Sequence, residues 1–137
     1  MNSTTKFSKR GDFRGVFLHV ETKLLAVIDP LVGEAEALCL GVNIAGRLEW
    51  SQVIFEGDSF IVMDSVGRNI ADCPWKIVHL ISWLQVQFSS HPSFRCVFSP
   101  RNANLAAHSL AQWAASSLKE GCFPEFHGHR QWFSWVY

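Results

Sequence analysis

The chain has 137 residues, of which 48% are hydrophobic, 13% aromatic and 18% charged. Twelve Lys and Arg residues balance twelve Asp and Glu residues, so the formal net charge is zero. The length predicts one domain, and an apolar content near one half excludes a disordered chain. The neutral balance excludes the strongly basic surface that would by itself indicate nucleic-acid binding.

The ends and the cysteines indicate the compartment. The start, MNSTTKFSKRGD, lacks the apolar core of a secretory signal, and no apolar run approaches the roughly 20 residues of a membrane span. The cysteines contain no CxxC pair, which excludes zinc-finger spacing; they are Cys39, Cys73, Cys96 and Cys122. We expect an intracellular protein, nuclear or cytoplasmic, with reduced and buried thiols. His127 and His129 leave metal binding on a Gly-rich segment as an alternative.

The first half of the chain predicts strands followed by a helix. Residues 15–20 and 23–28 are β-rich and close together, which predicts a hairpin that ends at Asp29-Pro30. Helical spacing follows and predicts a helix that stops at Gly46, with an apolar face made of Leu31, Ala35, Leu38, Val42 and Ala45.

The second half continues the alternation. We predict a strand over 50–56, a short helix over 60–66 with Ser59 as its cap, and a loop over 67–74. An amphipathic helix follows at 75–88 with Pro74 just ahead of its first turn, then a strand at 94–98 and a final helix at 100–119. The tail from Glu120 looks irregular. The order β-β-α-β-α-α-β-α predicts a layered α/β domain.

Acidic side chains stand at two places where a site could form. Glu34 begins the first long helix, and Glu36, two positions on, does not share its helix face. Asp58 follows a strand, at the end of which α/β sheets gather their sites. Carboxylates that converge from a helix and a strand end suit Mg²⁺, which prefers hard oxygen ligands. A solvated helix-end Glu and a capping Asp are the alternative readings for each acid alone.

Three segments in this order resemble the ribonuclease H-like domain of plant proteins, the type found in non-LTR retroelement reverse transcriptases. They are PLVGEAEALCLGVNIA at 30–45, VIFEGDSFIVMDSV at 53–66 and FSPRNANLAAHSLAQWA at 98–114. PWKIVHLISWLQVQF at 74–88 matches a helix that the family places between the last two. The resemblance covers about residues 11–118 and implies three parts: a polar start at 1–14, the ribonuclease H-like domain at 15–118 and an aromatic tail at 119–137.

The resemblance implies a mixed five-stranded sheet with helices on both faces. It also implies Mg²⁺-dependent cleavage of RNA in RNA–DNA hybrids by four carboxylates, in a monomer that needs no membrane. Glu34 corresponds to the acid of the first helix and Asp58 to the acid of the E-x-D-S motif, and both would bind the metal. His108 stands in the place of the fourth acid, and Arg101 and Asn104 match the linker before it.

The family opens with a central strand that bears an Asp-Gly pair, and the chain has no match for it. Residues 1–10 contain no acid, and Asp12 lies in the turn that follows. A missing central strand leaves two unpaired edges or forces a new pairing, to which TTKFS at 4–8 could add a few rungs. The sequence therefore predicts a truncated start, a missing or degenerate first strand and impaired hydrolysis.

Two functions remain open from the sequence. One is the family's ribonuclease activity with only two of four acids. The other is a non-catalytic nucleic-acid-binding or scaffold domain of retroelement origin. Its contacts would come from Asn104 on a 2′-hydroxyl, from Arg101 beside the proposed site, and from a basic cluster made of Lys6, Lys9, Arg10 and Arg14. The aromatic tail either packs over the sheet or forms a partner-binding patch.

Overall fold

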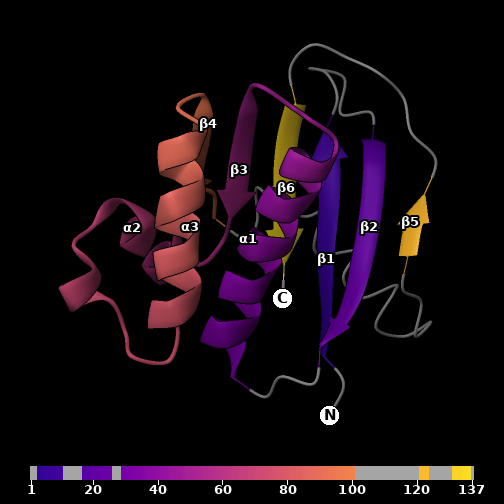
Figure 1. The fold of residues 1–137 in the computed structure, drawn as a ribbon. Coiled ribbons are helices and arrows are strands. Elements are labelled where there is room, and N and C mark those ends of the chain that lie inside the picture. The colour runs from indigo at the N-terminus through magenta and orange to yellow at the C-terminus, as the bar shows by residue number, and fades with distance from the viewer. Residues whose placement is uncertain (1–2, 11–16, 26–28, 101–120, 124–130, 137) are drawn as a thin grey trace.

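The structure is a computed structural model that describes residues 3–10, 17–25, 29–100, 121–123 and 131–136. These residues form the strands and helices shown in Figure 1. In chain order they are β1 (Ser3–Arg10), β2 (Phe17–Leu25), α1 (Pro30–Arg47), β3 (Val53–Gly57), α2 (Phe60–Gly67), the 3-10 helix η1 (Ile70–Asp72), α3 (Val78–Ser90), β4 (Phe94–Phe98), β5 (Gly121–Phe123) and β6 (Gln131–Val136).

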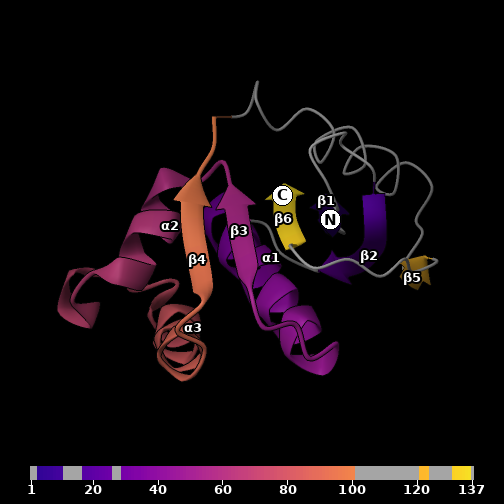
Figure 2. The same ribbon diagram turned by 90° about the horizontal axis from the view of Figure 1, so that it is seen from above.

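The described strands form one mixed sheet in the order β4-β3-β6-β1-β2-β5. Strands β4, β3 and β6 run parallel, whereas β6, β1, β2 and β5 pair antiparallel. Helices α1 and α3 lie side by side on one face of the sheet (Figure 2). The predicted α/β layering is confirmed. The resemblance also implies a helix on the opposite face of the sheet. The helix predicted over 100–119 lies almost entirely outside the described residues.

Residues 17–25 form one continuous strand, so the predicted hairpin over 15–28 is wrong. A two-residue hairpin turn needs positive φ at its centre and favours Asn-Gly or Asp-Gly, whereas the two runs are joined by Glu21 and Thr22. The antiparallel partner of β2 is instead β1, in a register from Ser3 opposite Leu25 to Lys9 opposite His19. The TTKFS segment therefore does add rungs to the sheet.

The C-terminal segment also departs from the prediction, because part of the tail expected to be irregular forms β5 and β6. Strand β6 lies between β3 and β1 in the interior of the sheet. The gap that the sequence predicts in the middle of the sheet is thus closed by a new pairing, made by β6, the last of the described strands. Tryptophan and phenylalanine in QWFSWV suit a strand, which the Gly and Pro residues around it had obscured.

Helix α1 has well-defined ends. Asp29 is its N-cap and Pro30 opens its first turn, where proline loses no hydrogen bond. At the C-terminus the amide of Trp50 donates to the carbonyl of Ala45 (2.9 Å) and that of Glu49 to Gly46 (3.1 Å). This pair of bonds is a Schellman motif. It places Glu49 at a φ of 55°, a left-handed conformation that favours glycine.

Replacing Glu49 with Gly is expected to stabilise the domain by about 1 kcal/mol, because glycine adopts the left-handed conformation without the Cβ clash. Urea unfolding followed by circular dichroism measures the change. Glu49→Ala is the matched control, since it removes the charge but keeps the strained conformation. Equal free energies of unfolding for the Gly and Ala variants would contradict the explanation.

Helix boundaries in the middle of the chain shift for local reasons. Ser59 caps α2 as predicted, and its Oγ accepts from the amide of Val62. The helix predicted from Trp75 begins instead at Val78, because the amide of Ile77 donates to the carbonyl of Pro74 and closes a turn there. Strand β3 begins at Val53 rather than Trp50, since Trp50 is used to close α1.

The core lies between the helices and the parallel strands. Phe55 of β3 is fully buried and meets Phe88 of α3 and Phe94 of β4 edge to face, with ring centroids 5.6 and 5.4 Å apart. Gln85 of α3 fixes the end of α2, because its Nε2 donates to carbonyls of that helix end at Ser65, Val66 and Arg68. These bonds attach the C-terminal end of α2 to α3.

Candidate functional site

The first turn of α1 is held to the segment before α3. Asp29 Oδ1 accepts from the amide of Leu31 at 2.9 Å, and Oδ2 accepts from Lys76 Nζ at 2.5 Å. The hydrogen bond from Lys76 is the main reason that the pKa of the Asp29 carboxyl is lowered. This contact fixes the beginning of the helix on which Glu34 lies.

The Asp29 contact predicts a pH-dependent stability. The pKa of Asp29 is depressed in the folded chain, so the ion pair stabilises above the ordinary carboxyl value of 3.8 and is lost as pH falls through the folded pKa. Asp29→Asn keeps a capping side chain but removes the charge, whereas Asp29→Ala removes both. At pH 7 we expect melting temperatures in the order wild type, Asn, Ala.

Well below pH 3.8 the wild type and Asp29→Asn should melt together, because the carboxyl is then protonated in both states. Thermal unfolding across a pH series checks this. A gap between these two proteins that persists at low pH would show that the cap alone, and not the charge, distinguishes them.

Glu34 is a buried acid. It lies one turn into α1, is 7% exposed, and its neighbours Ala35 and Leu38 belong to the hydrophobic core. The residue takes part in an interaction, while its Oε2 atom is fully buried and accepts no hydrogen bond. A carboxylate in such surroundings is costly unless hydrogen bonds or a cation stabilise it. A structural glutamate would more ordinarily be exposed.

Asp58 lies in the two-residue joint between β3 and α2. On one side, the carbonyl of Gly57 accepts from the amide of Ser99, which ties the ends of β3 and β4 together at 2.9 Å. On the other side Ser59 caps α2, and its carbonyl accepts from the amide of Met63. Asp58 is half-buried and takes part in an interaction of its own. Its backbone is therefore held from both directions.

The fold brings these two acids toward one end of the sheet. Helix α1 runs antiparallel to β3, so the first turns of α1 lie toward the end where β3 stops (Figure 1). Glu34 lies near the beginning of α1, and Asp58 directly follows β3. The C-terminal ends of parallel strands are the usual place for a site in an α/β sheet.

An exposed aromatic pair borders Asp58, and the sequence reading missed it. Phe60 and Phe98 are 58% and 44% exposed, and their rings meet edge to face with centroids 5.7 Å apart. One opens α2 and the other ends β4. The sequence signal for this pair was the position of each phenylalanine, one directly after a helix cap and the other at the end of a strand.

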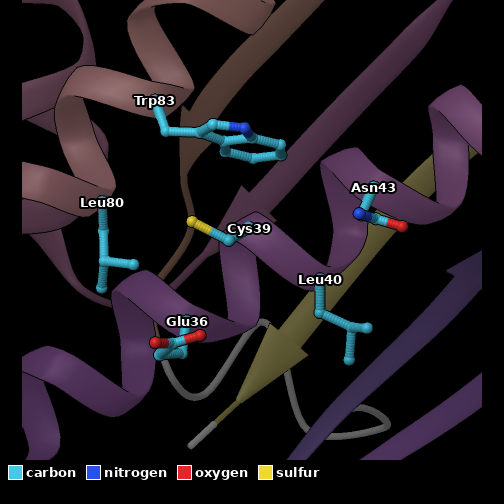
Figure 3. A pocket seen from close by; sticks show the side chains of 6 residues that line it. All are labelled: Glu36, Cys39, Leu40, Asn43, Leu80 and Trp83. Atoms are coloured by element: carbon cyan, nitrogen blue, oxygen red, sulfur yellow. The ribbon is translucent and has the colours of Figure 1, made fainter.

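A pocket of about 300 Å³ lies between α1 and α3 (Figure 3). Its lining combines apolar and polar side chains, namely Glu36, Cys39, Leu40, Asn43, Leu80 and Trp83. Glu36 and Glu34 are thus on different faces of α1, as their spacing predicts. The pocket contains one carboxylate, so it does not provide the oxygen ligands of a metal site.

The other predicted site residues fall elsewhere. Arg101, Asn104 and His108 lie outside the described residues, as do Arg14 and the His127–His129 pair. Lys6, Lys9 and Arg10 lie on β1. Cys39, Cys73 and Cys96 are free thiols, and burial raises the pKa of Cys96 to about 12, which keeps it protonated and unreactive.

Glu34 and Asp58 suit a Mg²⁺ ion that keeps most of its water ligands better than one whose ligands all come from protein side chains. Within 29–100 and the other described ranges, no group of three or more His, Cys, Asp or Glu side chains could hold a metal ion. Two carboxylates, one of them buried, are compatible with Mg²⁺, which usually keeps several of its waters.

The mixed sheet with α1 and α3 packed on one face is an α/β fold of the ribonuclease H-like class. The chain belongs to the reverse transcriptase-like family, whose profile matches residues 11–114. Among solved structures it is similar to the N-terminal RNase H domain of a Mycobacterium tuberculosis protein, solved as a fusion with maltose-binding protein. That similarity has a TM-score of 0.59 at 16% identity, and covers 87% of this chain and 100% of the other.

At 16% identity the solved RNase H domain supports the fold and no residue role. A comparison with curated proteins gave no match. Among the described helices, none has the length and apolar character needed to cross a membrane.

Proposed function

We propose that this chain is a nucleic-acid-binding domain that recognises RNA–DNA hybrids and binds one Mg²⁺ through Glu34 and Asp58. The observation that carries the proposal is the placement of a buried glutamate on α1 and an aspartate after β3 at one end of a ribonuclease H-like sheet. Membership of a reverse transcriptase-like family supports nucleic acid as the ligand and a retroelement origin.

Each residue has a distinct task in this proposal. The hydrogen bond between the ends of β3 and β4 and the Ser59 cap hold the backbone on both sides of Asp58. The Asp58 carboxylate can therefore bind a cation without rearrangement of the backbone. Glu34 contributes a carboxylate whose burial strengthens its attraction to a cation. Bound Mg²⁺ would supply water activation and charge stabilisation at a phosphate.

The exposed aromatic pair provides the non-metal part of the contact. Phe60 is two positions after Asp58, and Phe98 of β4 is opposite Gly57, the residue before Asp58. Both aromatic side chains are exposed. Exposed aromatic rings beside a phosphate-binding site pack against bases and sugars with little sequence preference. In the same proposal Arg101 and Asn104 contact the nucleic-acid backbone, and His108 replaces a fourth acid.

Hydrolysis by this site is expected to be weak. Two-metal phosphodiester cleavage uses two ions about 3.5–4 Å apart, which requires more carboxylates than Glu34 and Asp58. A histidine at position 108 is a poor Mg²⁺ ligand, because that ion prefers oxygen. Hybrid binding without fast cleavage is therefore the principal activity we propose, in a monomeric protein.

The test is binding and cleavage of an end-labelled RNA–DNA hybrid, with and without Mg²⁺, by the wild type, Glu34→Gln and Asp58→Asn. We expect Mg²⁺ to strengthen hybrid binding, and each substitution to weaken Mg²⁺ binding by about tenfold or more. Asp64→Asn is the matched control, since Asp64 lies on α2 and pairs with Arg68 instead.

The outcomes separate the two functions that the sequence left open. Slow cleavage that requires Mg²⁺ and Asp58 identifies an impaired nuclease. Binding without cleavage identifies a non-catalytic module. Hybrid binding that is indifferent to Mg²⁺ and to both substitutions contradicts the metal site, and failure to bind any nucleic acid contradicts the whole proposal.

A further inference from the structure

The side of α1 that faces away from the core lines the pocket between α1 and α3. The core side of this helix includes Ala35, Leu38 and Val42, all of which are buried. A different row lines the pocket, at spacings of three, four and seven positions, and consists of Glu36, Cys39, Leu40 and Asn43. None of these four residues is buried. The pocket therefore opens to solvent, and neither Glu34 nor Asp58 belongs to its lining.

The pocket is elongated, with polar ends and an apolar middle. Glu36 and Asn43 are seven positions apart, which is about 10 Å along the helix axis, and they lie at opposite ends of the row (Figure 3). The groups between them are apolar and come from both helices, namely Cys39, Leu40, Leu80 and Trp83. A ligand that fills the pocket lengthwise therefore needs one end that suits a carboxylate and a hydrocarbon body.

No described residue supplies a cation beside Glu36. A Lys or Arg three or four positions away would stabilise a glutamate on a helix, but those positions hold Val32, Gly33, Cys39 and Leu40. Lys76, just before α3, is paired with Asp29. Within the part of the chain that the structure describes, no hydrogen bond or ion pair involves the Glu36 side chain. This half-buried carboxylate is thus open to a cation from outside the chain.

Trp83 covers the apolar part of the pocket. Its ring extends from α3 toward α1 over Cys39 in the view of Figure 3, and 38% of the residue is exposed. A tryptophan ring buries a large apolar area when a ligand packs against it. Val86, three positions further along α3, is even more exposed but does not line the pocket. The exposed part of Trp83 therefore provides a flat surface for a hydrocarbon chain.

We propose that this pocket binds a small aliphatic amine, with its ammonium group on Glu36 and its hydrocarbon chain between Leu80 and Trp83. A volume of about 300 Å³ is at the lower limit of ligand pockets and favours a short chain. Glu36 is the one charged residue in the lining, so anions such as phosphates are disfavoured. The proposal does not rest on the proposed function, because the two sites share no residue and attract ligands of different kinds.

The first experiment titrates the full chain with hexylammonium, hexanol and hexanoate and follows the NMR signals of the Asn43 side-chain amide and the Trp83 indole. We expect hexylammonium to bind about fivefold more tightly than hexanol, which is the contribution of one partly exposed ion pair. Hexanoate should bind more weakly than hexanol. Butylammonium should bind more weakly than hexylammonium, by up to about fourfold for each methylene removed. Equal affinities for the three six-carbon ligands, or signal changes confined to residues outside the pocket, overturn the proposal.

The second experiment removes the charge of the pocket. Glu36→Gln keeps the shape of the side chain, so it should bind hexanol as the wild type does and should bind hexylammonium no more tightly than hexanol. Glu49→Gln is the matched control, because it changes the net charge equally at the end of α1 and outside the pocket. A preference for hexylammonium that persists in Glu36→Gln, or that disappears in Glu49→Gln, contradicts the role of Glu36.

The third experiment removes the apolar cover. Trp83→Ala should weaken hexylammonium and hexanol equally, by about fivefold, because both chains lose the same contact. Val86→Ala is the control on the same helix and should leave both affinities unchanged. Equal effects of the two substitutions overturn the assignment of the chain to Trp83. If Trp83→Ala does not fold, the three six-carbon ligands on the wild type and on Glu36→Gln still decide the matter.

Discussion

The structure depends on the hydrogen-bonding requirement of the middle of a sheet. An interior strand must satisfy backbone groups on both sides, because unpaired N–H and C=O groups there have no access to water. In this chain β6 meets that requirement between β3 and β1. The parallel and antiparallel parts of the sheet are hydrogen-bonded to each other through this strand, while α1 packs against both parts. The sheet is thus completed by a segment far in sequence from the strands it joins.

Much of the α/β core was predictable because its signals are local. Asp29-Pro30 marks the start of α1 with a cap and a proline, and Ser59 marks the start of α2 with a cap alone. The family resemblance located Glu34 and Asp58, and the structure gives both a fixed backbone, although their role as ligands stays a prediction. These features depend on residues within a few positions of one another, which the sequence displays directly.

The unpredicted features depend on contacts between distant residues. Glu21-Thr22 reads as a turn between two strands only until β1 provides a partner along the whole of β2. QWFSWV lies among Gly, Pro and His residues and gives no indication that it pairs with β3. Phe60 and Phe98 come together through the β3–β4 tie, which no spacing in the sequence reveals. The site residues at 101–108 lie outside the described residues and stay predictions.

The central place of β6 has a consequence for synthesis on the ribosome. Val136 pairs with Lys6, about 130 positions earlier in the sequence, so the strand in the middle of the sheet is made after both of the strands that flank it. Until residues 131–136 emerge, β1 and β3 present open edges, which attract other unpaired strands. Contacts of such long sequence separation also form slowly. During translation this domain is therefore exposed to aggregation for longer than a sheet that grows outward from its first strand.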